Sequence, residues 1–212
     1  MGAIIIRHSK LQAPYDNYDS LSLHDLDMLA MEKVQPHIDR DFAMAKIQKY
    51  LDSGLLEKGS IDAVYHSPSI RSRETASLLA TELGIFEVKE NDFLREIIFS
   101  PKKLISVAAF KSAGMQEVRE RVYEAVEQEK DVESTRTLLK RITSVRELIT
   151  NNQNRNILIV THGFFMRPLQ LALFENKQKF TASDQRRSIN PGYLEGFFFQ
   201  PQSTQVVELK TP

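Results

Sequence analysis

Two histidines follow short apolar segments, and both are of a type that could do chemistry. His8 comes after the residues Ala-Ile-Ile-Ile-Arg, and His162 comes after Asn-Ile-Leu-Ile-Val-Thr. Short β-branched runs without alternating polar residues are typical of strands buried on both faces, as in parallel sheets. Ligands of open α/β sheets bind beyond the carboxyl ends of the strands. We therefore expect both imidazoles at one site there, where a neutral imidazole could act as a nucleophile.

Two arginines could bring positive charge to the same place. Arg7 directly precedes His8, and Arg71 follows Ser67-Pro68, which has the composition of a helix entry. A cation in the first turn of a helix opposes the helix dipole unless an anion binds there. Guanidinium groups offer forked donors to phosphate oxygens. Arg71 at this helix entry predicts an anion site, with Arg73 at the surface and His66 in a structural role.

Alternating apolar runs and amphipathic segments predict the elements that position these residues. Strands are expected at residues 3–6, 61–65, 86–89 and 156–161, and an antiparallel pair at 193–199 and 205–209 around a turn at 200–203. Helices are expected at 42–56, 70–83 and 164–174, the last with Pro168 in its first turns. This order predicts an α/β fold, a three-layer α/β/α sandwich with a mostly parallel central sheet.

The stretch 115–152 is rich in Glu, Arg and Lys, with apolar residues at helical spacing. It predicts two amphipathic helices, or one broken helix, whose charges mostly face solvent. We interpret about 101–152 as a helical insertion or cap on a single domain that spans residues 1–212.

Composition excludes several classes of function. The 28 basic residues balance 28 acidic ones, so no global charge attracts nucleic acid or an anionic membrane. The chain has no cysteine, which excludes disulfides, thiolate nucleophiles and cysteine metal sites. No His-x-x-x-His spacing suggests a metal centre. The first apolar run is too short for a signal peptide or a membrane span, so a cytoplasmic protein is expected.

Four segments, in this order, resemble the histidine phosphatase superfamily, also called phosphoglycerate mutase-like. They are Ile6-Arg7-His8-Ser9, Ser67-Pro68-Ser69-Ile70-Arg71-Ser72-Arg73-Glu74-Thr75-Ala76, Leu94-Arg95-Glu96-Ile97 and Ile159-Val160-Thr161-His162-Gly163. The resemblance implies that His8 is the nucleophile that accepts a phosphoryl group. It implies a phosphate pocket of Arg7, Arg71 and His162, and Glu96 as the acid that protonates the leaving oxygen. It also implies a parallel sheet flanked by helices, with no cofactor and no metal.

The sequence departs from the family pattern at three places. Ser9 stands where most members have glycine or alanine, so its hydroxyl is expected to donate to the phosphate or its bulk to alter the pocket. Pro14 replaces a common asparagine, for which Asn17 could substitute. Residues 99–103 replace a Gly-x-x-Glu-Gly run near the proposed acid. The alternative acids are Glu90, Asp92 and Glu117.

The expected function is a metal-independent phosphatase that hydrolyses a phosphomonoester through a phosphohistidine on His8. The substrate would be a small molecule or a phosphoprotein. Two alternatives stay open: a phosphoglycerate-type mutase and a catalytically silent phosphate-binding protein. Separately, Arg7 and Glu96 could form a structural ion pair, and the Ser67-Pro68 and His162-Gly163 pairs could serve only as a helix cap and a turn.

Substrate specificity is expected from residues 10–40 and the charged helices, with Tyr15, Tyr18, Lys102 and Lys103 as candidate contacts. No pattern indicates an oligomeric state.

Overall fold

One mixed sheet forms the centre of the molecule in a computed structural model, which describes residues 1–201 and 206–210. Its six strands have the order β3-β2-β4-β1-β5-β6. The strands are β1 (Ala3–Arg7), β2 (Ala63–His66), β3 (Val88–Glu90), β4 (Ile157–Thr161), β5 (Gly196–Phe199) and β6 (Val207–Leu209). Neighbours from β3 to β1 are parallel, whereas β5 is antiparallel to both β1 and β6.

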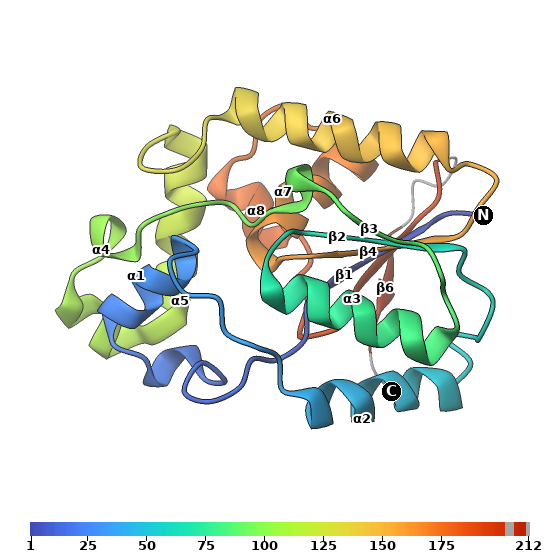
Figure 1. Ribbon diagram of the computed structural model, residues 1–212. Coiled ribbons are helices and arrows are strands. Elements are labelled where there is room, and N and C mark those ends of the chain that lie inside the picture. Colours follow the sequence, from blue (N-terminus) through green and yellow to red (C-terminus); the bar gives the residue numbers. More distant parts are fainter. Residues whose placement is uncertain (202–205, 211–212) are drawn as a thin grey trace.

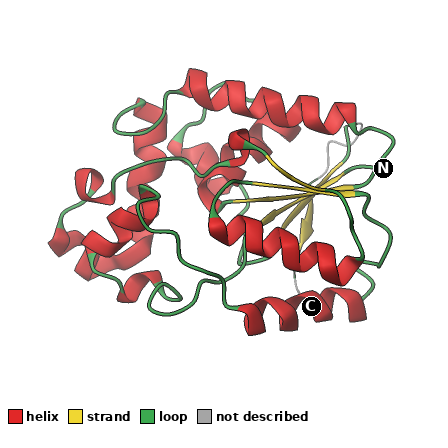
Figure 2. Ribbon diagram, viewed as in Figure 1, coloured by secondary structure: helices red, strands yellow, loops and turns green. Residues whose placement is uncertain are grey.

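Helices cover both faces of this sheet, because alternate strand residues are apolar on both sides. Ile4 and Ile6 face one hydrophobic cluster, and Ala3 and Ile5 face the other. The first cluster includes residues of α2 (Arg40–Asp52) and α3 (Ile70–Leu83), and the second includes residues of α6 (Thr135–Asn151) and α7 (Gly163–Glu175). Figures 1 and 2 show the sheet between these layers. The predicted α/β/α fold is confirmed.

A group of helices that we call the cap lies beyond the carboxyl ends of the parallel strands (Figure 1). It consists of α1 (Leu23–Ala30), α4 (Pro101–Leu104) and α5 (Val107–Gln128). Gly114 interrupts α5 with φ 55° and ψ −142°, a conformation that requires glycine. The short helix α8 (Ala182–Arg187) packs on α5 and α7. The predicted charged stretch therefore becomes two helices, α5 in the cap and α6 on the sheet.

The predicted elements differ from the observed ones mainly at their ends. The predicted strand 193–199 starts only at Gly196, because Leu194 has a positive φ of 60° that turns the chain. The third strand is shifted from 86–89 to Val88–Glu90. Pro168 is the sixth residue of α7, beyond its first turn. Residue 205, at the start of the last predicted strand, and positions 202 and 203 of the predicted turn lie outside the described residues.

Two short 3-10 helices lie beside the cap and the site. These are η1 (Tyr18–Ser20) and η2 (Asp92–Leu94). Among the described residues, no helix combines the length and the apolar character that crossing a membrane requires.

Candidate active site

His8 lies at the carboxyl end of β1 with 3% of its surface exposed. Its backbone N–H donates to the Thr161 carbonyl oxygen at 2.9 Å, which fixes it beside the end of β4. Its ring Nδ1 lies 2.7 Å from the Ser9 carbonyl oxygen. Because a carbonyl only accepts, Nδ1 must carry the ring proton. That tautomer leaves the lone pair of Nε2 free for chemistry.

The second imidazole lies beside the first. Since β1 and β4 pair in parallel with Arg7 opposite Thr161, the residues that follow them meet at one edge of the sheet. The ring centroids of His8 and His162 are 5.1 Å apart. Nε2 of His162 contacts the Ser67 hydroxyl at 2.8 Å, while Nδ1 is buried without a partner.

Arg7 is held on two sides. The Tyr193 ring lies 4.3 Å from its guanidinium carbon, and Nη1 donates to the Pro191 carbonyl oxygen at 3.2 Å. Gly163 approaches the other side: a Cβ at that position would lie 3.5 Å from Nε of Arg7. Nε itself is buried and has no hydrogen-bond partner.

Arg71 enters the site from the first turn of α3. The helix begins after Ser69, whose hydroxyl accepts from the Ser72 N–H, so Arg71 is its second residue. The Thr75 hydroxyl donates to the Arg71 carbonyl oxygen at 2.7 Å and accepts from the Ser9 N–H at 2.9 Å. Arg71 as a whole is only 5% exposed, and its Nη1 has no hydrogen-bond partner among the described residues.

Several buried polar atoms in or next to the site have no hydrogen-bond partner within the described parts of the chain. They are Nε of Arg7, Nη1 of Arg71, Nδ1 of His162 and the hydroxyl oxygen of Ser9. Buried polar groups in proteins are nearly always hydrogen-bonded, because an unpaired donor costs about 1–3 kcal/mol. Two of these groups are cations. Arg7 and Arg71 line the same pocket, where a bound anion with several oxygens, such as phosphate, would accept from both, whereas Ser9 and His162 are not among the lining residues.

Burial and the neighbouring arginine charges both favour the neutral form of the two imidazoles. Burial lowers the pKa of His8 well below its ordinary value, and the charges of Arg71 and Arg7 lower it further. Burial likewise lowers the pKa of His162, again with a contribution from Arg71. At neutral pH, His8 therefore presents an unprotonated Nε2.

Glu96 lies in the same pocket, at the N-terminus of α7. Its carboxylate accepts from the backbone N–H groups of Phe164 (3.2 Å), Phe165 (2.8 Å) and Ile97 (3.0 Å). Burial raises the pKa of Glu96, and these three amides offset part of the rise. A raised pKa suits a carboxylic acid that must donate a proton.

The alternative acids lie elsewhere. Glu90 is exposed on β3, Asp92 is exposed and pairs with Arg95, and Glu117 pairs with Arg121 on α5. None of the three lines the pocket. Glu96 is thus the candidate acid that shares a pocket with His8.

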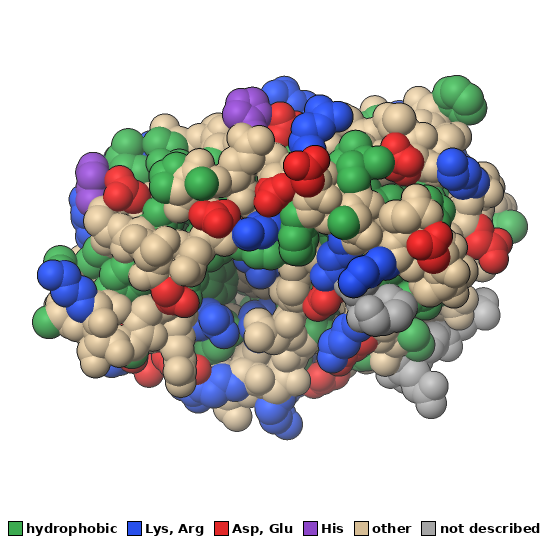
Figure 3. Space-filling model, turned by 90° about the horizontal axis from the view of Figure 1, so that it is seen from below, with side chains coloured by type: hydrophobic (Ala, Val, Ile, Leu, Met, Phe, Trp, Pro, Cys, Tyr) green, Lys and Arg blue, Asp and Glu red, His purple; other side chains and the backbone are tan. Residues whose placement is uncertain are grey.

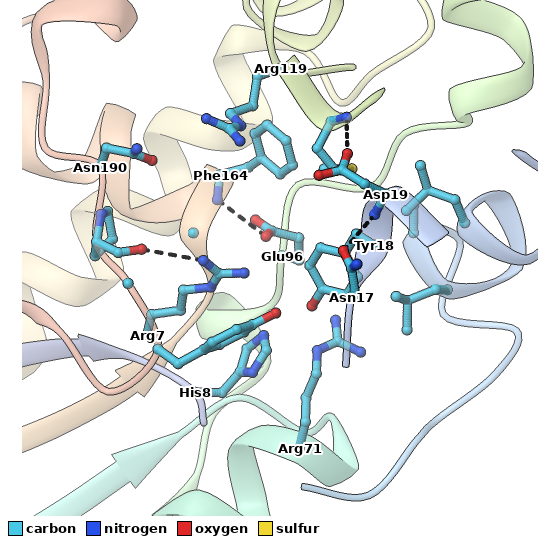
Figure 4. Close-up of a pocket in the computed structure, with 18 of the residues that line it drawn as sticks. Arg7, His8, Asn17, Tyr18, Asp19, Arg71, Glu96, Arg119, Phe164 and Asn190 are labelled. Carbon is cyan, nitrogen blue, oxygen red and sulfur yellow. Dashed lines mark hydrogen bonds between the residues drawn. The ribbon is translucent and has the colours of Figure 1, made fainter. Parts of the chain in front are cut away.

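The pocket over His8 has a volume of about 420 Å³. Its walls include residues that the sequence did not single out: Arg119, Phe164, Arg167, Asn190 and Tyr193. Figure 4 shows Glu96 between His8 and Arg119. Arg167 donates to Asn190 Oδ1 at 2.6 Å and to the Gln185 carbonyl oxygen at 2.9 Å. Arg119 comes from α5, so the cap contributes to the pocket.

Of the predicted substrate contacts Tyr15, Tyr18, Lys102 and Lys103, only Tyr18 lines the pocket, together with Asn17, the expected substitute for the family's asparagine. Tyr18 and Asn17 line the pocket (Figure 4), although Asn17 Oδ1 is occupied by the Asp19 N–H at 3.1 Å. Lys102 instead contacts His24, and Lys103 pairs with Asp131, both away from the pocket. Tyr15 packs against the core.

His66, like His8, is close to the next residue's carbonyl: its Nδ1 lies 2.8 Å from the Ser67 oxygen. It does not line the pocket. Within the described ranges, no group of three or more His, Asp or Glu side chains is arranged to hold a metal ion.

Comparison with known proteins identifies a family whose sequence pattern the chain matches. The sequence model of the histidine phosphatase superfamily (branch 1) matches residues 49–191, more than half of the chain. The match includes Arg71, Glu96 and His162 and begins after His8. No curated protein sequence matches the chain significantly.

Solved structures of low sequence identity share the fold. A phosphoserine phosphatase variant from Entamoeba histolytica, in complex with phosphoserine, is similar with a TM-score of 0.62, 16% identity and coverage of 98% of this chain and 94% of that one. A phosphoglycerate mutase from Bacillus anthracis is similar with a TM-score of 0.58 and 17% identity, and the match covers 98% of this chain and 92% of that one. A mycobacterial glucosyl-3-phosphoglycerate phosphatase has a TM-score of 0.58 and 15% identity, with coverage of 91% of this chain and 86% of that one.

Proposed function

The chain belongs to the histidine phosphatase superfamily (branch 1), and on this premise we propose that it is a phosphatase acting through a phosphohistidine on His8. The observation that carries the proposal is a set of nitrogens on Arg7, Arg71 and His162 that have no partner among the described residues, beside an imidazole whose Nε2 is free. Phosphoryl transfer depends mainly on positioning and charge stabilisation, and this set offers both.

In the first step, Nε2 of His8 attacks phosphorus while the bond from phosphorus to the alcohol oxygen breaks. Arg7, Arg71 and His162 donate to the equatorial oxygens, whose charge must be stabilised in the transition state. Glu96 gives its proton to the leaving alkoxide. Its raised pKa keeps that proton available.

In the second step, water replaces the alcohol. The Glu96 carboxylate, now ionised, removes a proton from the water as its oxygen attacks phosphorus. The bond between Nε2 and phosphorus breaks, inorganic phosphate leaves, and both His8 and Glu96 return to their starting states. No step requires a metal ion, so chelators are expected to leave the rate unchanged.

The wall around the leaving group favours a small, anionic substrate. Arg119 and Arg167 lie in the same cavity of about 420 Å³. On the face seen in Figure 3, basic side chains lie in a hollow of the surface. A phosphomonoester whose alcohol carries a second negative group would match this charge. Phosphoserine, which is bound to the Entamoeba histolytica relative, belongs to that chemical class.

The decisive experiment is rapid acid–base quench with a ³²P-labelled phosphomonoester. We expect label on the protein that survives alkali but not acid, as a phosphohistidine does, followed by release of inorganic phosphate. In His8→Ala, both the label and turnover should be absent while the circular dichroism spectrum is unchanged. Transfer of the label to a second substrate hydroxyl would indicate a mutase. Phosphate binding without any label would indicate a silent binding protein.

A further inference from the structure

One aromatic ring contacts both the candidate nucleophile and its neighbouring cation. The Tyr193 ring lies 4.3 Å from the guanidinium carbon of Arg7 and 6.1 Å, centroid to centroid, from the His8 ring. Both contacts are formed on the pocket side of the sheet edge. The ring therefore covers the two residues that our proposed mechanism requires most.

The backbone around Tyr193 is bound to β1 itself. Leu194 N–H donates to the Arg7 carbonyl oxygen at 3.0 Å, and Arg7 N–H donates to the Glu195 carbonyl oxygen at 2.9 Å. The Glu195 carboxylate accepts from Gly192 N–H and pairs with Lys46 of α2, both at 2.9 Å. The turn that presents the ring is thus fixed to the same residue that the ring covers.

A second aromatic side chain connects this ring to the cap. The Tyr18 and Tyr193 rings meet edge to face at 6.4 Å. The next residue, Asp19, accepts from the Met115 N–H of α5 just after the break at Gly114. A side chain at Gly114 would collide with the Asp19 carboxylate. A continuous series of contacts therefore runs from the cap to the phosphate site.

We propose that Tyr193 is a positioning residue: its ring fixes the guanidinium plane of Arg7 so that Nε faces the phosphate, and it excludes water from His8. The inference rests on the proposed function, because it assigns a role in that same site. It concerns a residue that forms no part of the four family-like segments.

Two separable effects follow from the two contacts. The π face attracts the guanidinium and limits its rotation, an interaction that only an aromatic ring provides. The bulk of the ring shields His8, and this effect any apolar side chain of similar size would reproduce. The charged or titratable groups that face His8 are Arg7 from β1, Arg71 from α3, His162 from the end of β4, and Glu96.

The test compares Tyr193→Phe, Tyr193→Leu and Tyr193→Ala. Inorganic phosphate affinity is measured by calorimetry, and the His8 pKa is followed by NMR with the ring signal assigned through His8→Gln. Neither readout requires turnover. Phe174→Leu serves as the matched control, because Phe174 packs on Phe197 and Phe199 instead of on the pocket.

We expect Tyr193→Phe to retain phosphate affinity within about twofold, since the π face remains. Tyr193→Leu should weaken it about 5- to 30-fold, the range of a desolvated cation–π contact, without moving the His8 pKa. Tyr193→Ala should weaken phosphate binding at least as much and should raise the His8 pKa, because burial is its largest cause of lowering. Thermal melting identifies any variant that is merely unfolded.

The inference is overturned if Tyr193→Leu binds phosphate as tightly as wild type, or if Tyr193→Phe is as weak as Tyr193→Ala. An unchanged His8 pKa in a folded Tyr193→Ala variant also contradicts it. A wild-type protein that binds phosphate but turns over no phosphomonoester would refute the proposed function alone. The affinity and NMR series would then still decide the role of Tyr193.

Discussion

Replacing Arg71 by methionine should lower activity strongly and raise stability at the same time. Arg71 is 5% exposed in the wild-type protein, and its Nη1 has no partner in the part of the chain that the structure describes. Methionine has a similar length but neither charge nor donor. In the transition state, loss of one well-aimed donor typically costs about 3–4 kcal/mol, so we expect kcat to fall by about 10²–10³.

The stability gain has the same origin. A buried donor without a partner costs about 1–3 kcal/mol in the folded protein, and the substitution removes it. For a chain of this length, each kcal/mol raises Tm by about 2–4 °C. Inorganic phosphate should raise the Tm of wild type, because it binds only the folded state, and should have much less effect on the variant.

The pH dependence of activity in Arg71→Met gives an independent test. The positive charge of Arg71 lowers the pKa of His8 and also opposes the rise in the pKa of Glu96. Without that charge, both pKa values should increase. The proposed mechanism requires neutral His8 and protonated Glu96, so it predicts that both limbs of the kcat/KM profile move to higher pH.

Arg73→Met is the matched control, because Arg73 lies on the same helix, two residues later, and is exposed. It should leave kcat, Tm and the pH profile close to those of wild type. The assays are phosphate release over a range of pH and differential scanning calorimetry with and without phosphate. If Arg71→Met retained kcat within about threefold, or melted well below Arg73→Met, the assignment of Arg71 to an anion site would be wrong.

Three further predictions address the acid, the cap and the buried imidazoles. Glu96→Gln should slow the hydrolysis of alkyl phosphates by about 10²–10⁴-fold. It should slow the hydrolysis of p-nitrophenyl phosphate far less, because that leaving group needs no proton. Equal losses of rate on both substrates would exclude Glu96 as the acid. Gly114→Ala should lower Tm more than Gly54→Ala. Both glycines have positive φ, where backbone strain alone costs about 1–3 kcal/mol, but only Gly114 adjoins Asp19. Equal Tm losses would contradict the contact between Gly114 and Asp19. Because His8 and His162 have lowered pKa values, the unfolded chain binds more protons below about pH 6.5, so the free energy of unfolding should fall between pH 6.5 and 5. Urea titrations should show that the free energy of unfolding falls less steeply with decreasing pH in His162→Gln than in wild type. The raised pKa of Glu96 changes this pH dependence in the opposite direction, equally in both proteins. The same slope in both proteins would argue against a neutral His162.

The strands that carry the site could be predicted from local pattern alone. Buried parallel strands require apolar residues on both faces, so the runs before Arg7 and before His162 were readable without neighbours. The cation in the first turn of α3 was readable in the same way, because helix-dipole energetics act within one turn.

Other features depended on packing between distant segments. Arg141 lies in the charged stretch that was interpreted mostly as a solvated face. It is instead part-buried, pairs with Glu133 and donates to the Phe93 carbonyl oxygen at 3.2 Å. It also lies over the Phe165 ring, whose backbone amide donates to Glu96. Helical periodicity identifies an apolar face, but it does not show which polar face another segment will cover.

By itself, the sequence determined the α/β/α architecture and the identities of the histidines and arginines at the strand and helix ends, because those signals are local. Only the tertiary structure decided which residues complete the pocket. Tyr193 was expected in a strand and lies in a turn, and Arg119 reaches the site from the cap. Nor could the sequence show that Glu96 accepts from three amides, or that buried nitrogens of Arg7, Arg71 and His162 lack partners among the described residues. These properties arise from distances between segments far apart in the chain, and such distances exist only once the sheet, its helices and the cap have packed together.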